Sequence, residues 1–233
     1  MIRFNLKANF VLNKNYFLII LLFVFWLFST YCYAGKTSLN LDSAPKINSP
    51  FLIKQIQDLV RQKRYIEAEK SCTLLLSSDP NNLEARSLRA SLNQRIGNTA
   101  KATEDYNFLI NNKRADGRVF NNLGVIYVKE KKYKEAEELF YKAIQISPER
   151  VEFHNNLSEL LMEIKDDDRA IEEYEKVIQL EPANVAALFN LGLIYKNKGE
   201  FIKAKEQWDK ILILNPDDKN AKSALEYLMS KKQ

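Results

Sequence analysis

Glycine and proline are scarce in this chain of 233 residues, with six of each. Tight turns and all-β folds depend on these two residues, so their scarcity favours helices. Histidine occurs once, as His154, and cysteine twice, as Cys32 and Cys72. So few ligands and nucleophiles exclude zinc sites, haem sites and cysteine–histidine nucleophile pairs. A glycine-rich phosphate loop is also missing. The sequence therefore predicts no enzyme, no metal ion and no cofactor.

An excess of one charge is missing as well, once the N-terminal segment is set aside. The formal net charge is +5, but Arg3, Lys7 and Lys14 lie in the first 34 residues, which contain no acid. Removing these three of 35 basic residues leaves 32 against 30 acidic residues, or +2. Proteins that bind nucleic acid carry a clear basic face. We therefore expect no nucleic-acid partner.

The isolated polar residues have structural interpretations. His154 is expected in the core or partly in it, because no second histidine or suitable cysteine stands near it in the sequence. Cys72 is the one cysteine after the N-terminal segment and is expected to be a small buried residue. Asp166 to Asp168 lack the alternating spacing and the glycine of a calcium loop. These acids are expected at the start of a helix, where negative charge is stabilising.

The first 34 residues have the layout of a secretory signal peptide. A basic stretch precedes thirteen apolar residues without a charge, Tyr16 to Phe28, and small residues at Cys32 and Ala34 predict cleavage after Ala34. Thirteen helical residues span about 20 Å, less than a hydrocarbon core of about 30 Å. Extended through Ala34, the run has nineteen residues and just spans. Residues 1–34 are therefore either a cleaved signal or a retained membrane anchor, and both deliver the remainder out of the cytoplasm.

Cys32 opens a third and minor alternative, the lipidated cysteine of a bacterial lipoprotein. Such signals place small residues before the cysteine, whereas Tyr31 is bulky. Residues 35–48 are mostly polar and lack sustained periodicity, so they are interpreted as a flexible linker.

Four of the six prolines follow a grid of 34 residues: Pro80, Pro148, Pro182 and Pro216, with Arg114 at the missing position. Proline ends a helix, and the Asn or Asp residues beside it favour the start of the next. Two amphipathic runs lie between these stops. In the clearest stretch, residues 117–150, apolar or small residues share one helix face in each run. Gly124 and Ala136 are expected to let the two helix backbones approach closely.

The same stretch resembles the tetratricopeptide repeat, a 34-residue helix–turn–helix unit. The match covers Phe120, Leu123, Gly124, Tyr127, Ala136, Phe140, Ala143 and Pro148. The resemblance implies an all-α tetratricopeptide-repeat solenoid of about five helix–turn–helix repeats, preceded by the N-terminal signal or anchor helix. The implied units are residues 49–82, 83–116, 117–150, 151–184 and 185–218, which together make a repeat domain of residues 49–218. Residues 219–233 are expected to form a C-terminal capping helix that covers the last repeat.

In this family the first helix of each pair lines the concave side of the solenoid, and ligand peptides lie along that groove. Carrying those positions over implies a candidate peptide-binding groove made of Asn121, Asn122, Val125, Val128, Lys129, Asn155, Asn156, Glu159, Phe189, Asn190, Leu193 and Lys196. Some family members clamp a partner's C-terminal carboxylate with Lys, Arg and Asn. Val125 and Glu152 stand where such a clamp requires Asn and Lys, so this mode is not expected.

Three of the groove residues, Asn122, Asn156 and Asn190, recur at 34-residue spacing. Each precedes a core leucine by one residue, which places it about 100° around its helix, toward the concave side. A side-chain amide offers a donor and an acceptor, as a peptide unit does. The column is expected either to bind a peptide backbone or to stay solvated.

The sequence therefore predicts an interaction protein that acts outside the cytoplasm and binds a protein or peptide partner. The leading hypothesis is a scaffold or assembly factor, exported to the periplasm, anchored in the membrane facing it, or secreted. Two alternatives stay open: a regulatory adaptor subunit of a cell-envelope enzyme, and a secreted protein directed at a host. A retained N-terminal segment would make the membrane a further partner.

Overall fold

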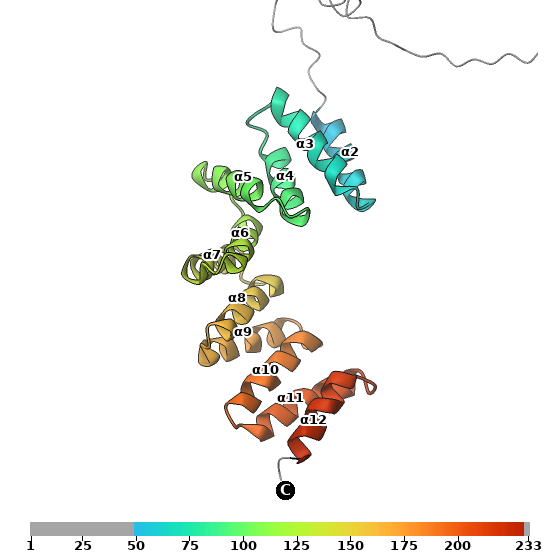
Figure 1. The fold of residues 1–233 in the computed structure, drawn as a ribbon, viewed down its shortest axis with the longest axis vertical. Coiled ribbons are helices and arrows are strands. Elements are labelled where there is room, and N and C mark those ends of the chain that lie inside the picture. Colours follow the sequence, from blue (N-terminus) through green and yellow to red (C-terminus); the bar gives the residue numbers. More distant parts are fainter. Residues whose placement is uncertain (1–48, 231–233) are drawn as a thin grey trace, which may run out of the picture. The chain divides into compact units, whose positions relative to one another are not determined.

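The computed structural model describes residues 49–230, which lie in one compact part of the chain. Within these residues there are eleven helices and no strand, so the all-helical expectation is confirmed there (Figure 1). The helices are α2 (Ser49–Arg61), α3 (Tyr65–Ser78), α4 (Leu83–Arg95), α5 (Thr99–Asn111), α6 (Gly117–Lys129), α7 (Tyr133–Ile146), α8 (Val151–Glu163), α9 (Asp167–Leu180), α10 (Val185–Asn197), α11 (Phe201–Leu214) and α12 (Lys219–Ser230). The predicted export segment, residues 1–34, and linker, residues 35–48, lie outside the described residues.

The helices form five consecutive pairs followed by α12. Each helix packs against the next one along the chain, and from α4 onward the packing is closest within a pair. The first helices, α2, α4, α6, α8 and α10, begin 34 residues apart, and α12 begins at the same interval. Ala221, Leu225 and Leu228 of α12 are buried, so this helix covers the end of the fifth pair. Between Ser49 and Ser230, every helix is too short or too polar to cross a membrane.

The pairs are separated by two kinds of helix ending. The residue before each proline of the 34-residue grid lies outside the helical region, as at Ser147 with φ −143° and ψ 78°, because a residue that precedes proline avoids that region. At the missing proline, α5 ends instead with Lys113 in the left-handed region, φ 54°. The Lys113 N–H donates to Ile110 O at 3.0 Å and the Arg114 N–H to Leu109 O at 2.9 Å. This pair of bonds is a Schellman motif, which ends the helix without proline.

The turn inside each pair uses the same left-handed conformation. One residue has positive φ at the same place in every pair, 34 residues apart: Lys63, Gly97, Lys131, Lys165 and Gly199. At Lys131 the N–H donates to Val128 O at 2.9 Å, and the Lys132 N–H donates to Tyr127 O at 2.9 Å. Only two of these five residues are glycine. The turn therefore depends more on the backbone hydrogen bonds that end the first helix than on the residue type at this place.

Four of the helices that begin at this 34-residue interval, α4, α6, α10 and α12, start at a side-chain cap supplied by Asn or Asp. Asn82, Asp116, Asn184 and Asp218 each accept a hydrogen bond from the backbone N–H three residues later, at 2.9–3.0 Å. The exception is α8, whose N-cap position holds Arg150 and has no side-chain bond. The second helix α9 begins at Asp166, which accepts from the Arg169 N–H, and Asp167 and Asp168 occupy its first turn. The helix-start interpretation of these acids is confirmed.

The core is built from aromatic rings seated on small residues. A Cβ at Gly124 would lie 2.7 Å from Cε1 of Phe140, and a Cβ at Gly192 would clash with the indole of Trp208. Ala136 is fully buried in the same pair. Gly124 was expected to allow a close approach of two helix backbones. The structure assigns the space to a ring of the second helix instead.

Candidate functional site

The predicted groove residues lie on the first helices α6, α8 and α10. Eleven of the twelve are half-buried or exposed, and Asn121 is buried, with 1% of its surface exposed. We call the exposed and half-buried part of this surface the groove face; it comprises Asn122, Val125, Val128, Lys129, Asn155, Asn156, Glu159, Phe189, Asn190, Leu193 and Lys196. Asn121 therefore acts from beneath the groove face through its hydrogen bonds.

A continuous set of hydrogen bonds runs under the groove face from α4 to α8. Nδ2 of Asn156 donates to Oδ1 of Asn121 at 2.7 Å, and Nδ2 of Asn122 donates to the Tyr106 hydroxyl at 3.2 Å. A longer contact of 3.4 Å joins Asn121 Nδ2 to Asn122 Oδ1. The Tyr106 hydroxyl donates in turn to Gln94 at 2.9 Å. Burial raises the pKa of Tyr106 to about 12, so this hydroxyl stays protonated at neutral pH.

Asn190 is held in the same way, by the second helix of the preceding unit. Its Nδ2 donates to the Tyr174 hydroxyl of α9 at 3.0 Å. Burial raises the pKa of Tyr174, and the nearby charge of Glu159 raises it further. Each asparagine of the column therefore has one amide hydrogen engaged within the protein. Among residues 49–230, Oδ1 of Asn156 and Oδ1 of Asn190 receive no hydrogen bond.

One of the two expectations for the column was that its side chains stay solvated. The three asparagines are half-buried and bonded, so that part of the expectation is wrong. Sequence spacing located the column, but its acceptors lie elsewhere: Tyr106 and Tyr174 sixteen residues before Asn122 and Asn190, and Asn121 thirty-five before Asn156. Tyr106 and Tyr174 occupy the place of Phe140 on their own second helices, 34 residues away on either side.

The charge of the groove face changes from one helix to the next. Positions i, i+4, i+7 and i+11 of a helix share one face. On α6 this line holds two cations around two neutral residues: Arg118, Asn122, Val125 and Lys129. On α8 it holds three acids around the column asparagine: Glu152, Asn156, Glu159 and Glu163. On α10 it is uncharged: Ala186, Asn190, Leu193 and Asn197.

A shallow hollow of about 300 Å³ lies at the C-terminal end of the groove face, between α10, α11 and α12. Its apolar lining includes Phe189, Leu193 and Tyr227, with Trp208 beneath. The Trp208 indole N–H donates to Phe189 O at 3.3 Å, and the rings of Phe189 and Trp208 lie 6.1 Å apart. The ammonium of Lys196 lies 5.4 Å from the centre of the Tyr227 ring, at the rim. Three predicted groove residues therefore share one hollow.

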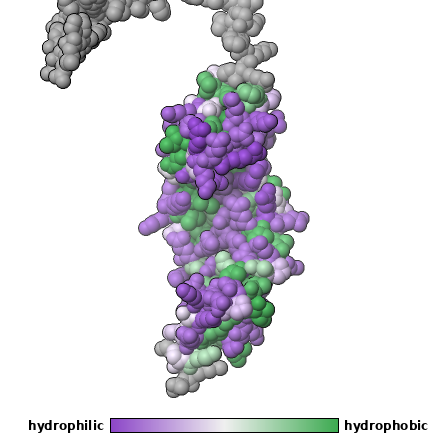
Figure 2. Space-filling model, turned by 90° about the vertical axis from the view of Figure 1, so that its right-hand side faces the viewer, coloured by the Kyte–Doolittle hydropathy of each residue, from purple (hydrophilic) through white to green (hydrophobic). Residues whose placement is uncertain are grey.

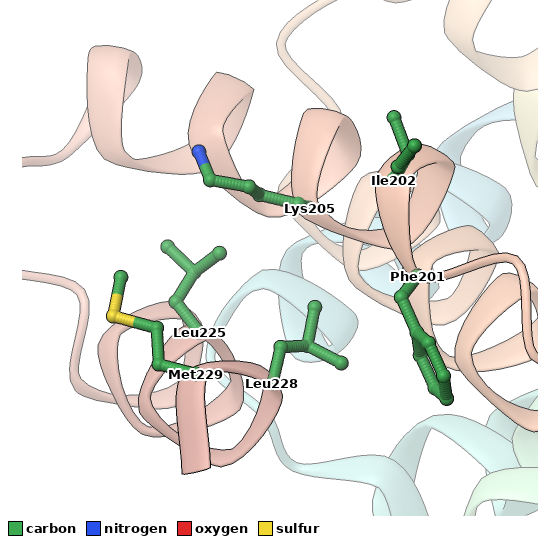
Figure 3. Close-up of a pocket in the computed structure, with 6 residues that line it drawn as sticks. All are labelled: Phe201, Ile202, Lys205, Leu225, Leu228 and Met229. Carbon is green, nitrogen blue, oxygen red and sulfur yellow. The ribbon is translucent and has the colours of Figure 1, made fainter. Parts of the chain in front are cut away.

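A second hollow of about 110 Å³ lies on the other side of α12. In Figure 3, Phe201 and Ile202 of α11 face Leu225, Leu228 and Met229 of α12 across it, with Lys205 at one side. None of these residues was a predicted site residue. Figure 2 shows that hydrophilic side chains cover much of one face of the described chain and that hydrophobic side chains surface between them in patches.

The chain's one histidine is engaged in a buried bond network. Nδ1 of His154 lies 2.6 Å from Oε2 of Glu173, and Nε2 lies 2.8 Å from Pro148 O. Both partners are acceptors, so the protonated, cationic form of the ring can donate to each of them. The hydrogen bond to Glu173 holds the pKa of His154 above its usual value, against the opposing effect of burial. The expectation of a core histidine is confirmed, since only 3% of the residue is exposed.

The remaining cysteine and the acidic side chains form no reactive or metal-binding site in the described residues. Cys72 is fully buried, and burial raises its pKa to about 12, so its thiol stays protonated. Residues 49–230 contain no group of three or more His, Cys, Asp or Glu side chains placed to hold a metal ion. The groove face is therefore a surface of amides, charges and apolar side chains suited to binding a polypeptide.

Comparison with protein-family models identifies the repeats. Models described as tetratricopeptide repeat match residues 117–150 and 185–218, and a model described as TPR repeat matches residues 159–199. The chain thus carries tetratricopeptide repeats, as the sequence resemblance implied. No curated protein matches the sequence.

Solved structures with the same fold include three examples. YrrB, a TPR protein with an unusual peptide-binding site, is 20% identical with a TM-score of 0.64, over 75% of this chain and 90% of that one. MamA from Desulfovibrio magneticus RS-1 is 16% identical with a TM-score of 0.67, over 76% and 98%. PilF of Pseudomonas aeruginosa is 20% identical with a TM-score of 0.64, over 75% and 87%. These likenesses establish the fold of the described helices.

Proposed function

We propose that this repeat-containing chain is a non-catalytic interaction scaffold that binds an extended peptide segment of a partner protein along its groove face. The similarity of its fold to YrrB, which has a peptide-binding site, supports this role. The observation that carries the proposal is the column of Asn122, Asn156 and Asn190, each held by an acceptor within the protein. The only histidine is occupied with Glu173 and Pro148 and takes no part.

Holding the amides in advance favours binding. A free asparagine side chain loses rotamer freedom when it bonds a ligand, and a side chain already fixed loses less. In Asn156 and Asn190 one amide hydrogen is engaged, while the carbonyl oxygen and the second hydrogen are left for a ligand. An extended peptide presents an N–H and a C=O at each residue, which match these two groups.

A selection experiment tests this role. The full chain, with a C-terminal tag and in detergent, selects binders from a random twelve-residue display library, and the dissociation constant is measured. Replacing Asn122, Asn156 and Asn190 with Ala is expected to weaken binding by about 0.5–1.5 kcal/mol for each hydrogen-bonded site. Affinities are measured at a temperature where circular dichroism shows every variant folded.

The chain offers a matched control for this triple variant. Asn111, Gln145 and Gln179 form a second column of amides at 34-residue spacing, exposed on the second helices α5, α7 and α9. Replacing these three with Ala removes the same number of amides away from the groove face and is expected to leave affinity unchanged. If both triple variants bind as tightly as the parent chain, the groove face is not the binding surface.

We further propose that the scaffold works outside the cytoplasm, in the periplasm, at the membrane or secreted. The support is the basic stretch, apolar run and small-residue pattern of residues 1–34, which lie outside the described residues. Residues 1–40 fused to a reporter that is active only outside the cytoplasm should give activity. Changing Leu21 and Val24 to Arg should abolish it, since each charge costs about 2.5–3.5 kcal/mol at the membrane centre. Full activity of that double variant would contradict export.

A further inference from the structure

The hollow at the end of the groove face is shaped for a large apolar side chain. Phe189 and Leu193 lie one turn apart on α10, and Tyr227 of α12 closes the opposite side. The bond from the Trp208 indole to Phe189 O fixes the floor. With about 300 Å³ of space, the hollow admits an aromatic or large aliphatic side chain of a ligand.

The neighbouring acids supply charge complementarity. Glu152 and Glu159 are exposed on the groove-facing line of α8, and neither forms an ion pair with any residue between Ser49 and Ser230. Glu163 on the same line accepts a hydrogen bond from the Tyr133 hydroxyl at 2.6 Å, which leaves its charge in place. The matching line on α10 has no charge, and the groove-face cation of α10, Lys196, lies over the Tyr227 ring at the rim of the hollow. A cation of a bound segment is therefore favoured beside α8.

We infer that the partner segment carries a basic residue and a bulky apolar residue, with the basic residue against Glu159 and the apolar residue in the Phe189–Tyr227 hollow. This inference rests on the proposed function and names the class of peptide that the groove selects. The cations Arg118 and Lys129 on α6 favour an acidic residue farther along the same segment.

The spacing within the segment follows from the stacking of the repeats. Packed helices lie about 10 Å apart, and an extended chain advances about 3.3 Å per residue. A segment crossing the helices therefore advances about three residues per repeat. The hollow lies between one and two repeats beyond α8, so the basic and apolar residues are about three to six residues apart.

The test uses the twelve-residue display library and the full chain described above. Peptides enriched by the parent chain should contain Lys or Arg three to six residues from Trp, Phe, Tyr, Leu or Met. Glu159→Lys should reverse the charge preference at that site and weaken the parent's best peptide about tenfold or more, since an attractive pair becomes repulsive. Leu193→Asp should weaken it at least about tenfold and remove the apolar preference.

Two controls separate the groove from the rest of the surface. Glu172→Lys reverses an exposed acid on α9, the second helix of the same pair, and should leave the selected motif unchanged. Ile202→Asp places a charge in the apolar hollow of Figure 3 and should also leave it unchanged. If Ile202→Asp weakened peptide binding as much as Leu193→Asp, the Phe189–Tyr227 hollow would not be the specific site of the apolar residue. That result would overturn the inference.

Different results would overturn the basic–apolar pairing and the proposed function. Peptides that need Asn122, Asn156 and Asn190 but show no basic–apolar pairing would overturn the inference and keep the groove as the binding surface. Peptides whose binding ignores both the asparagines and Glu159 would overturn the proposed function as well. Retention of the basic preference by Glu159→Lys would by itself contradict the assignment to α8.

Discussion

His154 and Arg86 stand two repeats apart and make the same pair of contacts. Each donates to the carbonyl of the preceding grid proline: His154 to Pro148 at 2.8 Å and Arg86 to Pro80 at 2.6 Å. Each also bonds a buried acid nineteen residues later, His154 to Glu173 and Arg86 to Asp105. A cation thus ties the end of one pair to both helices of the next. In the third unit the corresponding places hold Phe120 and Leu139, which are apolar.

The bridge at His154 makes stability depend on pH. The folded-state pKa of His154 is raised above its unfolded value of about 6.5. Its contribution is therefore fully present below pH 6.5 and is lost as pH rises through the folded pKa. Beside it are Glu173 and Lys176, which pair with each other at 2.9 Å. We expect the unfolding free energy of the parent chain to fall as pH rises above 6.5.

The control for this pH effect is His154→Gln, which cannot gain a proton. Its stability should change less between pH 6 and pH 9, so the difference between the two proteins should shrink as pH rises. Urea unfolding followed by circular dichroism measures both. A constant difference across that range would show that the ring is not charged in the folded state.

The missing cap of α8 predicts a stabilising substitution. Arg150 occupies the place of Asn82, Asp116, Asn184 and Asp218 but makes no side-chain bond to the helix. Arg150→Asn should add one cap and raise the unfolding free energy by about 1 kcal/mol. The reverse change at a working cap, Asn184→Ala, should lower it by a similar amount. Thermal melts of the two variants should move in opposite directions, and equal shifts would contradict the cap assignment.

The left-handed turns predict a second stabilising substitution. Lys131 and Lys165 hold φ of 61° and 66° in turns where Gly97 and Gly199 serve the same purpose. Replacing both lysines with Gly should remove the steric cost of a Cβ atom in the left-handed region, which is about 1 kcal/mol of unfolding free energy at each site. Glycine also makes the unfolded chain more flexible, which offsets part of this gain. Lys134→Gly, in the helical part of α7, should instead destabilise by about 0.5–1 kcal/mol. A loss of stability in the double variant would contradict the turn geometry.

The close contact between Gly192 and Trp208 predicts a destabilising substitution. Gly192→Ala drives a methyl group into the indole, which is fully buried and has no room to move. Overpacking of this kind costs about 1–3 kcal/mol. Glu226 stands at the same place in α12, is exposed, and Glu226→Ala should leave stability within about 0.5 kcal/mol. Equal melting of Gly192→Ala and the parent would mean that the ring is not held there.

The sequence predicted the helices because their signals are local. Each of these signals depends only on residues close together in the sequence: the proline grid, the caps and the 3.6-residue periodicity. Together they located the helix pairs of residues 49–230. The hydrogen-bond partners were not predicted. Glu173 lies nineteen residues from His154 and Tyr106 sixteen from Asn122, so each pair depends on how two helices pack. The Schellman ending at Lys113 was also missed, because lysine carries no signal for a left-handed conformation.

The bridges at Arg86 and His154 restrict how the repeats may be rearranged. Each bridge takes its cation and acid from one unit and its carbonyl from the unit before, so it forms only where those two units are adjacent. Moving residues 151–184 to follow residues 83–116 would place His154 after the Schellman ending at Arg114, and no longer after the non-helical Ser147 and Pro148. We therefore expect duplication or exchange of units to be tolerated only where the proline and the cation are moved together.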